Sequence, residues 1–198
     1  MSRQHKFIKY FLNITKVLHL LTICSIISVY VTQAVLFSYI AEVLKVLKIL
    51  VLSDTHHMIS NAVSLIERLN PDYVIHLGDM CEDCHRLEDM FPRKLIISVM
   101  GNNDYFDKSY PLERVFELGG KKIFMCHGHK YNVKSSLLRL IYKGKELGAD
   151  IILYGHTHIA YLEDDGDVVV MNPGSVGTYG ILEINEGKIE AKIEKYGI

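Results

Sequence analysis

Seven side chains of this 198-residue chain combine the residue types and spacing that a divalent metal site needs. The first two, Asp54 and His56, directly follow an apolar run at 49–53, and the last two are His156 and His158. The full set is Asp54, His56, Asp79, Asn102, His127, His156 and His158. Carboxylate and amide oxygens together with imidazole nitrogens, and without a thiolate, favour Mn²⁺, Fe²⁺, Ni²⁺ or Zn²⁺. A single Asp or His at a strand end is common, whereas this arrangement at five strand ends predicts a metal site.

Seven ligands are more than one tetrahedral ion binds, but they suit two ions that share a carboxylate. Two ions about 3.5–4 Å apart hold the attacking and leaving oxygens of an in-line phosphoryl displacement. They also lower the pKa of a water that bridges them, so that hydroxide forms near neutral pH. We therefore predict a hydrolase of phosphate esters that uses a hydroxide bridging two metal ions.

Apolar runs that end on these residues predict the strands that position them. The runs are 49–53, 73–77, 95–99, 122–126 and 151–154. Apolar residues at helical spacing predict helices between the strands, at 60–69, 83–91 and 132–147. Strand, helix and strand at this pitch form right-handed βαβ units, and ligands gather at the carboxyl edge of such a sheet.

Beyond residue 158 the apolar pattern has a period of two, which predicts antiparallel strands. They are 159–163, 168–171, 179–184 and 188–193, with turns at 165–166 and 186–187. A further hairpin is predicted around Gly119-Gly120, between runs at 115–118 and 122–126. The body of the chain is therefore predicted to be one α/β domain with its strands packed in two layers.

The ordered motifs resemble those of the calcineurin-like metallophosphoesterases. They are Asp54-x-His56, Gly78-Asp79, Gly101-Asn102-x-Asp104, His127 and Gly155-His156-x-His158. Asn172-Pro173-Gly174-Ser175 and the small size resemble the compact YfcE-type phosphodiesterase branch. The resemblance covers about residues 48–198 and implies an α/β fold, a two-layer mixed β-sandwich flanked by helices. It also implies a small phosphodiester as substrate. The sequence leaves a homo-oligomer open.

The resemblance implies a division of the ligands between two divalent ions. Asp54, His56, Asp79 and His158 would hold one ion, and Asp79, Asn102, His127 and His156 would hold the other, with Asp79 as the bridge. Mn²⁺ is the first choice of metal, with Ni²⁺, Fe²⁺ and Zn²⁺ as the alternatives.

The third motif departs from the pattern of many relatives, which carry a His where this chain has Asn103. That His helps to protonate the leaving group or to hold the phosphate, so a proton donor must lie elsewhere. His129, His57 and Asp104 are the candidates, and Asn102 is assigned to the catalytic set as well as to the metal.

A second class of function is a scaffold that keeps this fold but binds a protein partner, as the retromer subunit of the fold does. Degraded ligand positions would favour that alternative. Every ligand position of this chain carries a metal-binding residue type, which favours an enzyme.

Residues 1–47 lie outside the resemblance and are predicted to be a separate extension from the domain at 48–198. The run at 17–41 has no formal charge and is long enough to cross a membrane, following Arg3, Lys6, Lys9 and Lys16. It is either a membrane helix that tethers a cytoplasmic catalytic domain, or sequence translated from upstream of the true start. The remaining chain holds 17 basic and 22 acidic side chains, which argues against a broad nucleic-acid-binding surface.

Overall fold

The computed structural model describes residues 30, 33 and 46–196 of the chain. The predicted apolar segment at 17–41 lies outside the described residues, apart from positions 30 and 33. Among the described residues, no helix has both the length and the apolar character needed to cross a membrane. Val46–Ile198 make up one compact unit, and this unit contains every predicted ligand.

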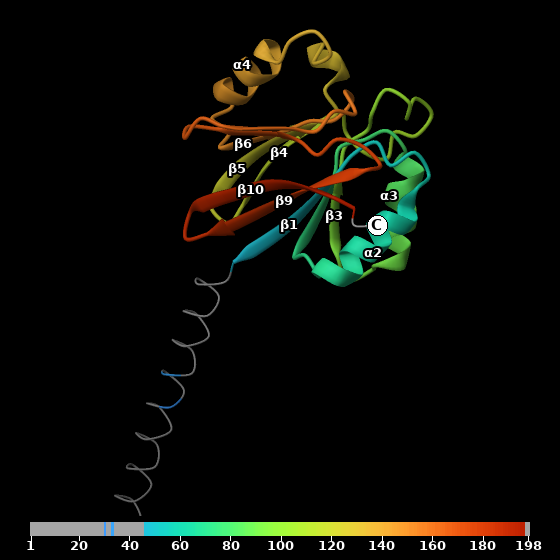
Figure 1. The fold of residues 1–198 in the computed structure, drawn as a ribbon, viewed down its shortest axis with the longest axis horizontal. Coiled ribbons are helices and arrows are strands. Elements are labelled where there is room, and N and C mark those ends of the chain that lie inside the picture. Colours follow the sequence, from blue (N-terminus) through green and yellow to red (C-terminus); the bar gives the residue numbers. More distant parts are fainter. Residues whose placement is uncertain (1–29, 31–32, 34–45, 197–198) are drawn as a thin grey trace, which may run out of the picture. The chain divides into compact units, whose positions relative to one another are not determined.

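Two five-stranded sheets pack face to face in this unit (Figure 1). The strands of the first sheet are β1 (Leu47–Leu52), β2 (Tyr73–His76), β3 (Leu95–Ser98), β9 (Thr178–Asn185) and β10 (Lys188–Lys195). Those of the second sheet are β4 (Glu113–Leu118), β5 (Lys121–Cys126), β6 (Ile151–Leu153), β7 (Tyr161–Asp164) and β8 (Val169–Asn172). The strand orders are β10-β9-β1-β2-β3 and β4-β5-β6-β8-β7.

Each sheet has three parallel strands that include those predicted to end on ligands. β1, β2 and β3 are parallel, and β9 and β10 add to β1 as antiparallel strands. β5, β6 and β8 are parallel, with β4 and β7 antiparallel at the two edges. The predicted two-layer mixed sandwich is therefore confirmed.

Burial on both faces explains why the central strands lack polar alternation. In β1, Ile49 and Val51 point into the core between the sheets, where they join Met125 and Leu153 of the second sheet. The alternate β1 residues, Leu50 and Leu52, face the helices on the outside of the first sheet.

Helices cover the outer faces of the two sheets (Figure 1). They are α2 (Ile59–Leu69) and α3 (Cys81–Met90) on the first sheet, and α4 (Leu138–Glu146) on the second. α2 buries Leu65 and Ile66 against β1, and Leu87 of α3 joins the same cluster. The helices cover the faces of the sheets and leave their edges open. The loops with the predicted ligands follow the carboxyl ends of the parallel strands, at one of these edges.

The predicted helix at 132–147 is wrong in its first third. Asn132 adopts a left-handed backbone with φ of 54° and ends a short 3-10 helix at His129–Tyr131. Asn tolerates this conformation better than most residues, so it terminates a helix here instead of capping a new one. The α-helix begins only at Leu138.

Candidate metal centre

Loops from both sheets meet at one edge of the sandwich and bring the predicted ligands together. The amide of Asp54 donates to the carbonyl of Gly78 at 3.1 Å, which joins the loops after β1 and β2. The amide of His156, after β6, donates to Asp54 Oδ2 at 3.1 Å and so ties the second sheet to the first. Gly155 N also donates to the carbonyl of His127 at 3.0 Å.

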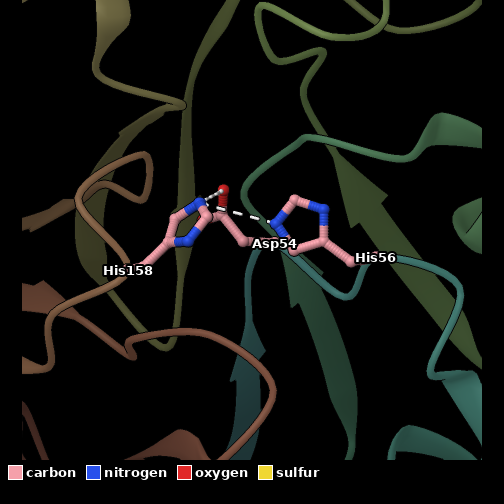
Figure 2. A group of neighbouring side chains, drawn as sticks. All are labelled: Asp54, His56 and His158. Atoms are coloured by element: carbon pink, nitrogen blue, oxygen red, sulfur yellow. Dashed lines mark hydrogen bonds and ion pairs between the residues drawn. The ribbon is translucent and has the colours of Figure 1, made fainter.

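Asp54, His56 and His158 form one group whose ligand atoms all lie within 4.8 Å of one another. His158 Nε2 is 3.1 Å from Asp54 Oδ1 and 3.5 Å from His56 Nε2. Figure 2 shows the two imidazoles turned toward each other on either side of the carboxylate. Asp54 Oδ2 accepts hydrogen bonds from Ser53 and His156, but Oδ1 is buried and accepts none. A buried carboxylate oxygen facing two imidazole nitrogens fits a divalent cation.

Asp54, Asp79 and His127 form a second group with the same spacing. His127 Nδ1 donates to the carbonyl of Leu77 at 2.8 Å, which leaves Nε2 as the nitrogen that faces the group. That Nε2 lies 3.1 Å from Asn102 Oδ1 and 3.4 Å from Asp79 Oδ2. The donor set is again oxygen and imidazole nitrogen, and Asp54 belongs to both groups.

The charge state of Asp79 suits a metal ligand. Burial acts to raise its pKa, but the hydrogen bond and charge of His127 outweigh burial and lower the pKa to about 2. Asp79 is therefore ionised at neutral pH. In the absence of a metal ion, burial lowers the pKa of His127, and the carboxylate of Asp79 more than offsets this, so the net shift is upward.

His156 lies beside the second group without entering it. Its ring centroid is 5.0 Å from that of His127, and neither group of ligand atoms includes its nitrogens. Burial, with a contribution from His127, lowers the pKa of His156 to about 4, so the ring is neutral at neutral pH and keeps a free nitrogen lone pair. The structure therefore groups five of the predicted ligands, puts Asn102 in contact with His127, and leaves His156 against the ring of His127.

Five of the predicted ligands have a backbone that non-glycine residues seldom adopt. The φ values are positive at Asp54 (52°), His56 (45°), Asp79 (56°), His156 (68°) and His158 (61°). Left-handed backbone costs roughly 1–2 kcal/mol per residue, so it persists only where the surroundings hold it. Its concentration at the ligands indicates loops shaped for a site.

Asp104 anchors the loop after β2, which carries Asp79. It is buried, and its two carboxylate oxygens accept hydrogen bonds from four backbone amides at 2.7–3.0 Å. The donors are Asp79, Met80, Cys81 and Gly101. A carboxylate occupied in this way favours a positioning role over the proton donor predicted from the sequence.

The other two candidate proton donors lie in different surroundings. His129 packs near His127, with ring centroids 5.5 Å apart, and its buried Nδ1 has no hydrogen-bond partner. Burial lowers the pKa of His129, and the neighbouring His127 lowers it further. The side chain of His57 is 57% exposed, and its Nδ1 lies 3.6 Å from a carboxylate oxygen of Asp83.

Two asparagines support the ligand loops through contacts that the sequence does not predict. Asn103 donates from its backbone and side-chain nitrogens to the two oxygens of Asp79, at 2.9 and 2.7 Å. Asn172 is buried and donates to the carbonyl of Gly155 and to Thr157 Oγ1, both at 2.9 Å, within the loop that carries His156 and His158. The position of both asparagines in or beside the motifs was the available signal for a supporting role. Their contacts join residues 15 to 24 positions apart in the chain, which a local pattern does not predict.

From within the core, His76 also links the loop after β1, which carries Asp54 and His56, to the loop after β2, which carries Asp79. These are called the first and the second ligand loop. Its Nδ1 accepts from the amide of Gly78 at 3.2 Å, so Nε2 carries the proton and donates to Thr55 Oγ1, also at 3.2 Å. The side chain is fully buried, and burial lowers its pKa to about 4. His76 is therefore a neutral imidazole that needs both of its hydrogen bonds.

We expect His76 to make the metal-free protein less stable in mild acid. Between about pH 6.5 and pH 4 the unfolded chain binds a proton at His76 that the folded chain does not, so stability falls as pH falls. The full loss from this residue is about 3 kcal/mol. Urea unfolding at pH 7 and pH 4.5 measures it, and His76→Gln should show a smaller decrease over the same range. Equal decreases in the two proteins would contradict the assignment.

Comparison with known sequences supports the family resemblance that the motifs indicate. The family model described as the calcineurin-like phosphoesterase superfamily domain matches residues 47–186. The probable metallophosphoesterase YsnB of Bacillus subtilis is 33% identical over 132 residues, which cover 66% of this chain and 75% of that protein. A phosphodiesterase of Methanocaldococcus jannaschii is 30% identical over 161 residues, covering 69% and 93%.

Solved structures share the fold. A predicted phosphoesterase of Streptococcus pneumoniae superposes with a TM-score of 0.63 at 27% identity, over 77% of this chain and 91% of that one. Vacuolar protein sorting 29 of Cryptosporidium parvum superposes with a TM-score of 0.62 over 77% of this chain and 99% of its own. The latter is 18% identical, a level at which the likeness extends to the fold alone.

Proposed function

This chain belongs to the calcineurin-like phosphoesterase superfamily and is a metal-dependent phosphoesterase, and we propose that it hydrolyses phosphodiesters with two divalent ions. The observation that carries the proposal is the pair of overlapping ligand groups, both of which contain Asp54. The relative described as a phosphodiesterase supports diesters as the substrate class.

The ligand groups of the structure overlap at Asp54, whereas the proposed ligand sets follow the division that the family resemblance implies, in which Asp79 is the bridge. One ion would be held by Asp54, His56, Asp79 and His158, and the other by Asp79, Asn102, His127 and His156. When bound, such a pair of ions lowers the pKa of a shared water and neutralises charge on the phosphoryl oxygens. The donor set of oxygen and imidazole without thiolate suits Mn²⁺, Fe²⁺, Ni²⁺ and Zn²⁺, and Mn²⁺ is the first metal to test.

The chain's own residues orient the ligands and the substrate. Asp104 and Asn103 hold Asp79 through its amide and its carboxylate. His129, neutral at neutral pH and beside His127, is proposed to donate a hydrogen bond to a phosphoryl or leaving-group oxygen. A neutral imidazole has one N–H to donate and does not give up that proton near neutral pH, so the proposed role is hydrogen bonding and not full proton transfer.

We expect metal removal to abolish turnover and Mn²⁺ to restore it. Protein treated with a chelator should not hydrolyse bis(p-nitrophenyl) phosphate, and should regain full activity as about two Mn²⁺ ions bind per chain. The assay pairs release of p-nitrophenol with metal analysis, and compares the diester with p-nitrophenyl phosphate. A preparation that binds two ions but hydrolyses neither ester would favour the alternative function, a scaffold for a protein partner. Activity that survives complete metal removal would overturn the proposal.

A further inference from the structure

The carboxylate of Asp83 reaches from helix α3 into the first ligand loop. It is fully buried, and its Oδ2 accepts from Thr55 Oγ1 at 2.6 Å and from the amide of His57 at 2.9 Å. Thr55 and His57 are the two neighbours of His56 in the chain. Asp83 therefore binds the loop on both sides of a proposed metal ligand without contacting that ligand.

The same hydrogen bonds continue into the second ligand loop, and the direction of each is determined. Thr55 has one hydroxyl proton, which it gives to Asp83, so it accepts the proton of His76 Nε2. His76 Nδ1 then accepts from the amide of Gly78, which precedes Asp79. One continuous chain of hydrogen bonds thus runs from Gly78 through His76 and Thr55 to Asp83.

The first loop needs such support because its backbone is unfavourable. Asp54, His56 and His57 all have positive φ, at 52°, 45° and 63°. At roughly 1–2 kcal/mol per residue, this conformation would relax in a loop without fixed partners. A relaxed loop would move His56 away from His158, whose ring now lies 5.0 Å from it between centroids.

We propose that Asp83 is a positioning residue that holds the first ligand loop in its left-handed form, so that His56 faces Asp54 and His158 before metal binds. The inference rests on the proposed function, since it assumes that these three side chains bind an ion. Its basis is the two hydrogen bonds to Oδ2, which require an acceptor oxygen and do not require a negative charge. Asp83 Oδ1 accepts no hydrogen bond and lies 3.6 Å from His57 Nδ1.

The geometry separates two substitutions of Asp83. Asp83→Asn keeps an oxygen for Thr55 and His57, and places its NH₂ group where it can donate to His57 Nδ1. Asp83→Ala removes both bonds and frees the loop. Asp89→Ala, an exposed carboxylate on the same helix, is the matched control.

Titration of each metal-free protein with Mn²⁺ by calorimetry tests the proposal. We expect Asp83→Ala to weaken one of the two binding steps by about 10–100-fold, as loss of a supporting hydrogen bond does at other metal sites. Asp83→Asn should stay within about threefold of wild type, and Asp89→Ala should not differ from it. At saturating Mn²⁺ the Asp83→Ala protein should recover kcat with an unchanged KM.

Three results would overturn the inference. They are wild-type binding by Asp83→Ala, an Asp83→Asn protein as weak as Asp83→Ala, or equal weakening of both steps, which a merely structural role would produce. If Asp83→Ala does not fold, Thr55→Val and Thr55→Ser provide a second matched pair, in which only Val should weaken binding. Calorimetry measures metal binding and does not depend on turnover. A protein that binds both ions but hydrolyses no diester would therefore refute the proposed function and leave the inference about Asp83 standing.

Discussion

Asp79→Asn is expected to lower kcat for a phosphodiester by about a thousandfold or more while the chain stays folded. Asp79 is ionised at neutral pH because its pKa lies at about 2, and it is the proposed bridge between the two ions. An amide keeps the volume but carries no negative charge. The charge stabilisation lost is several kcal/mol, and each 1.4 kcal/mol is about tenfold in rate.

The measurement is turnover of bis(p-nitrophenyl) phosphate at saturating Mn²⁺, with circular dichroism to check the fold. Asp89→Asn makes the same chemical change on the exposed face of α3 and should leave kcat at the wild-type value. Wild-type turnover by a folded Asp79→Asn protein would exclude this carboxylate from the reaction.

Asp104→Ala is expected to lower the free energy of unfolding by about 4 kcal/mol or more. Four backbone amides lose their acceptor, and each buried donor left unpaired costs about 1–3 kcal/mol, although water will satisfy part of this demand. Asp104→Asn should also destabilise, because its NH₂ group would face two of those amide donors. Urea unfolding of the metal-free proteins measures both effects.

Asp107→Asn is the matched control for Asp104. Asp107 lies in the same loop and accepts hydrogen bonds from His85 and the amide of Ser109, but its side chain is 32% exposed. Its loss should cost about 1 kcal/mol or less, since water replaces the partner. Equal destabilisation by Asp104→Asn and Asp107→Asn would mean that the buried cluster of amides does not depend on Asp104.

The parts of the fold that the sequence predicts are those set by burial over short stretches. The run at Leu47–Leu52 is apolar at every position except Lys48, because both faces of β1 are covered, and Asp54 then follows at the carboxyl end of the strand, buried among the loops of the site. The same pattern predicts Asp79 and His127 at the ends of β2 and β5. Local composition was sufficient because parallel strands bring their carboxyl ends to one edge.

The parts that could not be predicted depend on contacts between distant residues. Asp83 meets Thr55 across 28 positions, and Asp104 meets the amide of Asp79 across 25. No sequence pattern marks Asp83 for such a contact, and the third motif singles out Asp104 without indicating which backbone amides it binds. The start of α4 was missed for a different reason, since Asn132 suits both a helix N-cap and a left-handed turn.

The two sheets contribute unlike atoms to the proposed centre. Loops of the first sheet supply every oxygen donor, from Asp54, Asp79 and Asn102, and one imidazole, whereas loops of the second sheet supply imidazoles only. A cation bound by both sets would act as a crosslink between the halves of the sandwich, and separating the halves would break its coordination. The two layers are otherwise held by apolar packing and by a few hydrogen bonds, such as that from the amide of His156 to Asp54. A domain that keeps its metal would therefore resist separation of its two sheets better than the metal-free domain.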